Sequence, residues 1–266
     1  MDFVNSKKEN RVLESFFWNM LGGLINAGQS VYFSIIITRV SGLYWAGIFS
    51  LAYSTAIMCL SIGNYSMRNY QVTDIQKMFT FKEYLFSRYI TCAFMFISCV
   101  IFLIYKEVTI GYSADKIICI ILMCLFKIVD SLEDVFHGLY QKKGRLDIAG
   151  KQQTYRLISA IIVFTIIFIA SKSLIIALSG MFVTALLLFL WYTHITFPFF
   201  KDNKEQLSPK KILVLLKFCF PLFISSFLIL YIGNASKYAI DLYYDESIQA
   251  YYSFIAMPIL DRKSTR

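Results

Sequence analysis

The stretch Ile117–Tyr140, IICIILMCLFKIVDSLEDVFHGLY, decides how the rest of this chain is interpreted. It is long enough to cross a bilayer, which takes about 20 predominantly apolar residues in a helix. Its ionisable residues are Lys127, Asp130, Glu133, Asp134 and His137. Because ionisable groups at membrane depth are costly, they usually face a cavity and pair with one another. The stretch therefore predicts a membrane helix with a functional polar face.

The chain as a whole is too apolar for a soluble domain. Of its 266 residues 58% are hydrophobic, and the mean hydropathy is +0.60. Soluble domains contain about 45–50% apolar residues. Since the excess is spread along the whole length, we expect an all-α membrane protein embedded in a lipid bilayer. The net charge of +9 fits basic cytoplasmic loops, so nucleic acid is not an expected partner.

Long apolar runs alternate with short polar segments, which predicts a polytopic helical bundle. We expect seven full spans, at about residues 16–38, 43–63, 84–105, 117–140, 155–170, 174–197 and 218–240. An eighth run at 247–260 is too short for a full span. Residues 261–266, DRKSTR, match what common sequencing-adapter DNA encodes. We therefore expect a C-terminal truncation of the reading frame, with residues 261–266 an artefact.

The distribution of basic residues predicts the orientation of the bundle. Lysines and arginines gather in the N-terminal tail and in every second connection, for example QKKGR at 141–145. We assign Arg88 and Arg156, which lie near span ends, to the same basic segments. Because cytoplasmic loops are enriched in these residues, we expect the N-terminus in the cytoplasm.

The polar residues of Ile117–Tyr140 are spaced to share one helix face. Positions i, i+3, i+7, i+10 and i+14 form a continuous stripe, and they hold Lys127, Asp130, Asp134, His137 and Gln141. Glu133 flanks this stripe. Three carboxylates against one lysine require partners from another helix, a bound cation or protonation. Three interpretations stay open: a cavity that handles a charged substrate or ion, an interhelical salt-bridge cluster, and a catalytic carboxylate pair.

Other candidate residues lie outside that stretch. The first span is unusually polar, and its candidate cavity residues are Asn26 and Gln29. Arg39 and Lys237 lie near the outer ends of the first and seventh spans, where they would form a basic mouth if those spans face each other. The residues expected at the cytoplasmic mouth are Arg68 and Gln141. Anchoring to lipid headgroups and helix packing are the alternative roles.

The sequence offers no sign of a cofactor or metal site. The six cysteines all lie in apolar runs without a CxxC pair, and the two histidines are far apart. Phosphate-binding and dinucleotide-binding glycine patterns are missing. We therefore expect no metal, no cofactor and no enzymatic activity.

Several segments of the sequence carry a resemblance to a known family. They are TRVSGLYWAGIFSLA at 38–52, MRNYQVTD at 67–74, EDVFHGLYQKKGRLDIAGK at 133–151, GNASKYAID at 233–241 and AYYSFIAMP at 250–258. Together they resemble the polysaccharide (O-antigen type) repeat-unit flippases, a family within the superfamily of the MATE exporters and the lipid II flippase. The resemblance covers about residues 10–260.

The resemblance implies a MATE-like fold of two six-helix lobes around a central cavity. Residues 1–200 would form the N-terminal lobe, and residues 201–260 the start of the second lobe. The implied substrate is an undecaprenyl-diphosphate-linked oligosaccharide, moved outward across the bacterial cytoplasmic (inner) membrane for surface polysaccharide such as lipopolysaccharide. Glycosyltransferases and a polymerase of the same pathway would be partners.

The resemblance also implies roles for named residues. Lys127, Arg39 and Lys237 would supply cations for the diphosphate, and Asp130 and Asp134 would bind a coupling proton or sodium ion. Two alternatives remain. One is a multidrug or cation-coupled exporter of the same superfamily. The other is a polytopic polysaccharide polymerase or acyltransferase, which predicts a large outer loop that this sequence lacks.

Overall fold

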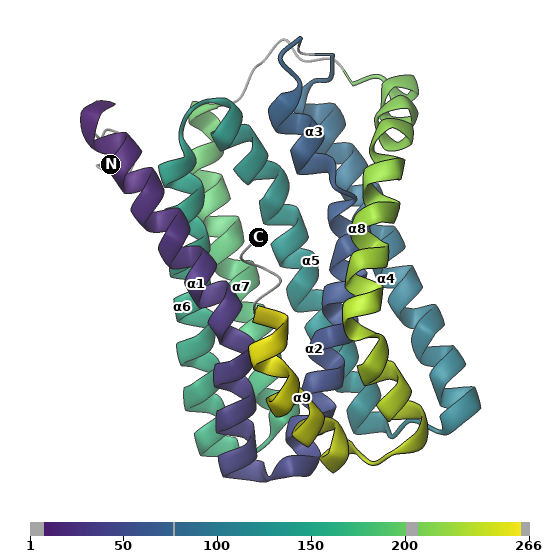
Figure 1. The fold of residues 1–266 in the computed structure, drawn as a ribbon. Helices are drawn as coiled ribbons and strands as arrows, with labels where there is room; N and C mark the ends of the chain where they lie inside the picture. Colours follow the sequence, from purple (N-terminus) through teal and green to yellow (C-terminus); the bar gives the residue numbers. More distant parts are fainter. Residues whose placement is uncertain (1–7, 77, 201–206, 262–266) are drawn as a thin grey trace.

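The chain folds into a bundle of long helices that run alternately up and down (Figure 1). The computed structural model describes residues 8–76, 78–200 and 207–261, and these contain no strand. The elements are α1 (Lys8–Ser41), α2 (Leu43–Asn64), α3 (Met67–Thr73), α4 (Phe81–Ile110), α5 (Ala114–Lys142), α6 (Leu146–Ser171), α7 (Leu174–Thr196), the 3-10 helix η1 (Phe197–Phe199), α8 (Pro209–Tyr243) and α9 (Glu246–Asp261). Residues 262–266, most of the predicted artefact, lie outside the described residues.

Within the described residues, six segments are long and apolar enough to cross a membrane. They are α1, α2 together with α3, α4, α6, α7 with η1, and α8. Large apolar side chains such as Phe94, Ile101 and Ile166 are exposed on the outside of the bundle, as suits contact with lipid. The expected all-α polytopic bundle is therefore confirmed. Helix α5 has 29 residues but too many charges to join this group.

Most of the helices are longer than the predicted spans. Helix α4 begins at Phe81, where Thr80 and Glu83 form a capping box, and α6 begins at Leu146. Hydropathy detects only the part of a helix that lies in hydrocarbon, whereas backbone hydrogen bonding and capping continue the helix past it. Arg88 and Arg156, which lie near the starts of the predicted spans and which we counted with the basic cytoplasmic segments, therefore lie seven and ten residues into their helices.

A sharp break separates α2 from α3 in a segment that the sequence suggested was a loop. Tyr65 and Ser66 both have positive φ, 48° and 50°, a conformation that costs residues other than glycine about 1–3 kcal/mol each. Both are held by α8. The ring of Tyr65 stacks on Phe223 with centroids 4.5 Å apart, and the Ser66 hydroxyl lies 2.9 Å from that of Ser226. The break turns Arg68 on α3 toward α5.

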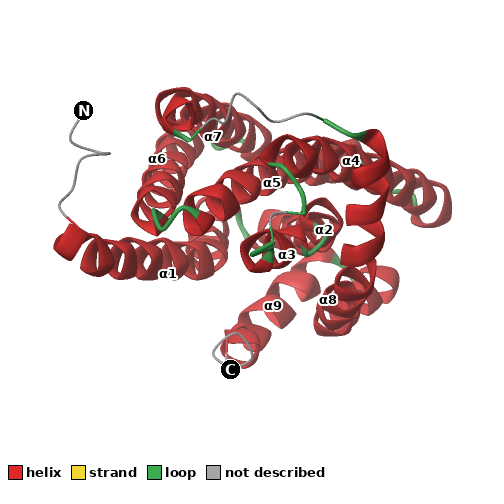
Figure 2. Ribbon diagram, turned by 90° about the horizontal axis from the view of Figure 1, so that it is seen from above, coloured by secondary structure: helices red, strands yellow, loops and turns green. Residues whose placement is uncertain are grey.

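Helix α5 lies in the middle of the bundle. It contacts α2, α3, α4, α6 and α7. Seen from above, α1, α6 and α7 lie on one side of it, and α8 and α9 on another (Figure 2). This central position removes α5 from lipid on most sides. It explains how a helix with so many charges belongs to this bundle.

Helices α1 and α6 cross closely at Gly150. A Cβ atom there would lie 2.8 Å from the backbone nitrogen of Asn19 and 2.8 Å from the carbonyl carbon of Trp18. Since both are backbone atoms, they cannot move without the whole helix. We expect Gly150→Ala to push α1 from α6 and to lower the free energy of unfolding by about 1–3 kcal/mol, measured by thermal unfolding in detergent.

Gly23→Ala is the matched control for this prediction. Gly23 lies within α1, and a Cβ atom there would meet nothing within 4 Å. This substitution should leave stability unchanged or raise it by up to about 1 kcal/mol, because alanine favours the helix. Equal melting temperatures for the two variants would contradict the close crossing at Gly150.

Candidate functional site

The charged stripe of α5 divides between two sets of neighbouring helices. Lys127, Asp130 and Glu133 make their ion pairs within α5 and with α6. Asp134 and Gln141 instead bind arginines of α3 and α4. Their spacing sets Lys127, Asp130, Asp134 and Gln141 on one broad face of α5, with Glu133 beside it. That face, however, meets several helices instead of one open cavity.

Arg156 of α6 is the centre of the first cluster. Its Nη2 lies 2.6 Å from Oδ1 of Asp130 and 2.7 Å from Oε2 of Glu133. Nζ of Lys127 lies 2.7 Å from Oδ2 of the same Asp130. Both cations are almost fully buried. Two cations and two carboxylates balance, which offsets much of the cost of burying charge.

Helix α1 reaches the first cluster through Tyr53 of α2. The ammonium of Lys127 lies 5.3 Å from the centre of the Tyr53 ring. Gln29 donates to the hydroxyl of Tyr53 at 3.4 Å and to Oδ1 of Asn26 at 2.7 Å. Gln29 is buried and Asn26 exposed. The candidate amides of α1 are thus connected to the charged face of α5.

Asp134 belongs to a second cluster. Oδ2 of Asp134 accepts a 2.8 Å bond from Arg88 of α4, and Oδ1 lies 3.3 Å from Nη1 of Arg68. Arg68 also donates to Gln141 at 3.0 Å. The side chain of Arg88 is fully buried, while that of Arg68 is 33% exposed. Two arginines share one carboxylate, so this cluster carries net positive charge.

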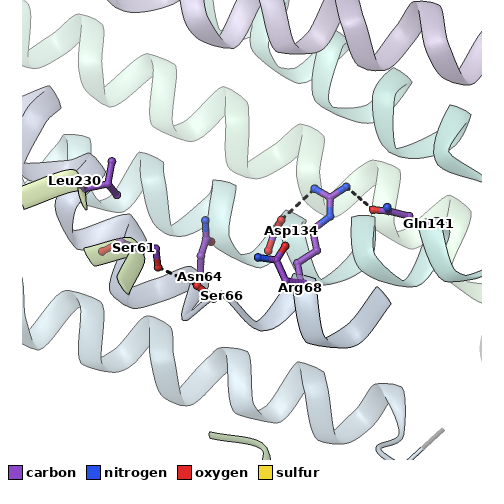
Figure 3. Close-up of a pocket in the computed structure, with 9 residues that line it drawn as sticks. Ser61, Asn64, Ser66, Arg68, Asp134, Gln141 and Leu230 are labelled. Atoms are coloured by element: carbon purple, nitrogen blue, oxygen red, sulfur yellow. Dashed lines mark hydrogen bonds and ion pairs between the residues drawn. The ribbon is translucent and has the colours of Figure 1, made fainter. Parts of the chain in front are cut away.

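A polar cavity of about 520 Å³ adjoins the second cluster. Its lining residues are Ser61, Asn64, Ser66, Arg68, Asn69, Asp134, Gln141, Ser226 and Leu230. Figure 3 shows Arg68 held between Asp134 and Gln141. The lining comes from α2, α3, α5, α8 and the break between α2 and α3, with Leu230 its one apolar residue. This cavity can surround a polar, hydroxyl-rich group and offers it a cation.

Asp74, a buried aspartate directly after α3, holds the connection between α3 and α4 in place. Asp74 accepts bonds from the backbone nitrogens of Met78 and Phe79, at 2.9 and 3.3 Å. Its carboxylate also lies 3.5 Å from the ammonium of Lys142 at the end of α5. Burial opposes the charged form, but these bonds outweigh it and hold the pKa of Asp74 below its usual value. The carboxylate therefore stays ionised and ties this connection to α5.

The two expected outer cations lie on separate helices. Arg39 is exposed in the last turn of α1. Lys237 of α8 donates to the hydroxyl of Ser54 on α2 at 2.8 Å. Among the described residues no hydrogen bond or ion pair joins Arg39 to Lys237, and none joins Lys237 to a carboxylate. Lys237 is therefore a cation without a carboxylate partner in this part of the chain.

A further ion cluster lies at the opposite end of the bundle, where α8 ends. Asp241 is buried, and its carboxylate lies 2.9 Å from Nζ of Lys106 and 2.7 Å from Nζ of Lys116. The hydroxyl of Tyr112 also donates to it. Burial and the neighbouring Asp241 raise the pKa of Tyr112, so this hydroxyl keeps its proton. The cluster joins α8 to α4 and α5.

Three of the six cysteines meet in the core. The sulfur atoms of Cys59, Cys99 and Cys124, from α2, α4 and α5, lie within 4.8 Å of one another. All six thiols are buried and free. Sequence spacing gives no hint of this meeting, because the three residues come from different helices.

Arg88 and Arg156, the two buried arginines that pair with carboxylates of α5, were not among the candidate residues expected from the sequence. Counting basic residues by segment treats every arginine near a span end as a loop residue. A signal was nonetheless present. Arg88 lies within LFSRYI, and Arg156 directly precedes the apolar run LISAIIV, whereas Arg68 and Arg145 have mostly polar neighbours.

The family model of polysaccharide biosynthesis proteins matches residues 12–260, nearly the whole chain. The chain belongs to this family. No curated protein and no solved structure matches it in the same comparisons. The resemblance carried by the sequence motifs is thereby confirmed. A role in polysaccharide biosynthesis, at a membrane, follows for this helical bundle.

Proposed function

We propose that this protein moves lipid-linked oligosaccharide repeat units across the bacterial cytoplasmic membrane during surface polysaccharide biosynthesis. The supporting observation is a polar cavity of about 520 Å³ within apolar helices of a polysaccharide biosynthesis protein. Sugar hydroxyl groups must keep hydrogen-bond partners inside a membrane, and the serine, asparagine and glutamine side chains of the cavity supply them. An O-antigen unit on undecaprenyl diphosphate is the substrate we propose.

The proposal places the described helices in two lobes of a MATE-like transporter. Residues 1–200 hold six membrane crossings, with α5 as a full span, and residues 201–260 begin the second lobe. The N-terminus lies in the cytoplasm, so the cavity opens toward the side where glycosyltransferases build the substrate. The two lobes rock around the cavity, as in transporters built from repeated bundles, with a proton or sodium ion as the coupling ion. A polymerase then uses the delivered unit.

Arg68 is the residue we assign to the diphosphate in this conformation. Its guanidinium is partly exposed, and it shares Asp134 with Arg88, so its charge is incompletely neutralised. Arginine binds phosphate groups through paired hydrogen bonds. Lys127, which we expected in this role, is buried, forms an ion pair with Asp130 and lies near the ring of Tyr53. Lys237 and Arg39 would meet the substrate later, toward the outer side.

We expect Arg68→Gln to reduce transport by roughly tenfold or more, because a hydrogen bond to a charged group contributes about 1.5–3 kcal/mol. The measurement is surface polysaccharide, together with lipid-linked units retained on the inner leaflet, in cells that lack their own flippase and express the full chain. Lys210→Gln is the matched control, since Lys210 is exposed at the start of α8. Normal polysaccharide with Arg68→Gln would refute the assignment. Altered drug resistance with unchanged polysaccharide would favour a multidrug exporter.

A further inference from the structure

Two buried atoms on adjacent turns of α5 face each other without a hydrogen-bond partner. Oε1 of Glu133 and Nε2 of His137 are 3.7 Å apart, and their side chains are only 2% and 7% exposed. Neither atom has a hydrogen-bond partner among the described residues. A buried polar atom left unpaired costs about 1–3 kcal/mol. A proton held by either group, with a small closing movement, would satisfy both atoms at once.

Charged and titratable groups of several helices surround Glu133 and His137, and the charged ones already form ion pairs with one another. The charged and titratable groups near this pair are Arg156 from α6, Arg68 from α3, Arg88 from α4, Tyr53 from α2, and Lys127, Asp130, Asp134 and Tyr140 from α5. Tyr140 shares a 2.6 Å hydrogen bond with Thr196, where α7 ends. Arg156 occupies only the other oxygen of Glu133, Oε2.

The other carboxylates of α5 are poorer places for an added proton. Asp130 contacts Lys127 and Arg156, and Asp134 contacts Arg68 and Arg88. Protonating either would weaken two ion pairs. A proton at Glu133 and His137 would instead form a hydrogen bond between Oε1 and Nε2, two atoms that lack a partner among the described residues. We expected a coupling proton at Asp130 or Asp134, but the contacts favour Glu133 together with His137.

We infer that Glu133 and His137 form a proton-binding site inside the bundle, with one proton shared between Oε1 and Nε2. The 3.7 Å distance and the missing hydrogen-bond partners among the described residues support this site by themselves. Only its use rests on the proposed function: the proton would drive movement of the lipid-linked substrate. A neutral Glu133 holds Arg156 weakly and an ionised Glu133 holds it strongly. Proton binding would therefore loosen the tie between α5 and α6, and proton release would tighten it.

Histidine NMR tests this inference directly, because the chain contains only two histidines. The purified full chain, with nitrogen-15 in its histidines, would be followed between about pH 4 and about pH 9, a range that spans ordinary carboxyl and imidazole titration. His194→Gln identifies the His137 signal. We expect Glu133→Gln to move the midpoint of the His137 transition by at least about one pH unit, which is about tenfold in proton affinity.

Infrared spectroscopy gives an independent measurement if Glu133→Gln folds poorly. The carbonyl stretch of a protonated carboxyl group should change with pH in the unsubstituted chain, and His137→Gln should shift its midpoint. Glu83→Gln is the matched control, because Glu83 is equally buried but serves the cap of α4.

An unmoved His137 midpoint in a folded Glu133→Gln variant would overturn the inference. So would a carboxyl signal that is indifferent to His137→Gln. Coupled titration in a chain that fails to restore polysaccharide would uphold the proton site and count against the proposed function alone. Normal transport without any coupled titration would do the reverse.

Discussion

Replacing Arg156 by methionine is expected to lower the free energy of unfolding by about 3–5 kcal/mol, the usual cost of removing one partner from a buried ion pair. Arg156 is 1% exposed and contacts both Asp130 and Glu133. Without it, two carboxylates three residues apart share one buried face with Lys127 as their remaining cation. Chemical unfolding in detergent, followed by circular dichroism, would measure the loss.

A double substitution separates this electrostatic effect from lost packing. Arg156→Met with Glu133→Gln removes one stranded charge, so its stability should lie above that of Arg156→Met alone. A favourable interaction energy in the resulting cycle is expected, because the two residues are in direct contact. Arg39→Met is the control, since Arg39 is exposed at the end of α1. If Arg156→Met were no more harmful than Arg39→Met, the cluster would not hold α5 to α6.

Replacing Asp241 by asparagine is expected to weaken the contact of α8 with α4 and α5 at the end of the bundle where α8 ends. Asp241 is the carboxylate shared by Lys106 and Lys116. Its loss leaves Lys106 buried without an ion pair among the described residues, and leaves Lys116 with Glu246 at 3.4 Å. We expect stability to fall by about 3–5 kcal/mol. An amine-reactive reagent should also label both lysines faster, as mass spectrometry would show.

Asp245→Asn is the matched control for this prediction. Asp245 lies four residues further along the chain but is exposed, so its replacement should change stability by less than about 0.5 kcal/mol. Unchanged labelling of Lys106 and Lys116 in Asp241→Asn would show that this end of the bundle is held by apolar packing. Faster labelling would show that this ion cluster joins α8 to α4 and α5.

Much of the helical architecture was predictable from the sequence. Apolar runs long enough to cross a bilayer occur throughout, and the structure forms helices at each of them. The boundaries were less accurate, as at Phe81 and Leu146, because polar helix ends are set by capping and backbone bonding. The candidate site was predicted in part. Residues on α5 were recognised from their cost in a membrane, whereas Arg88 and Arg156, near the ends of predicted spans, were counted with the basic cytoplasmic segments.

The sequence alone determined that Ile117–Tyr140 is an exception, an apolar helix whose charges need partners. Spacing within one helix is a local property, so it placed Lys127, Asp130 and Asp134 on a shared face. Which partners meet them depends on how separate helices pack, and no local pattern carries that information. Only the tertiary structure showed that α4 and α6 contribute buried arginines, dividing the stripe into two clusters. It also showed that Oε1 of Glu133 and Nε2 of His137 lie 3.7 Å apart without hydrogen-bond partners among the described residues, because Arg156 of α6 contacts only the other oxygen of Glu133.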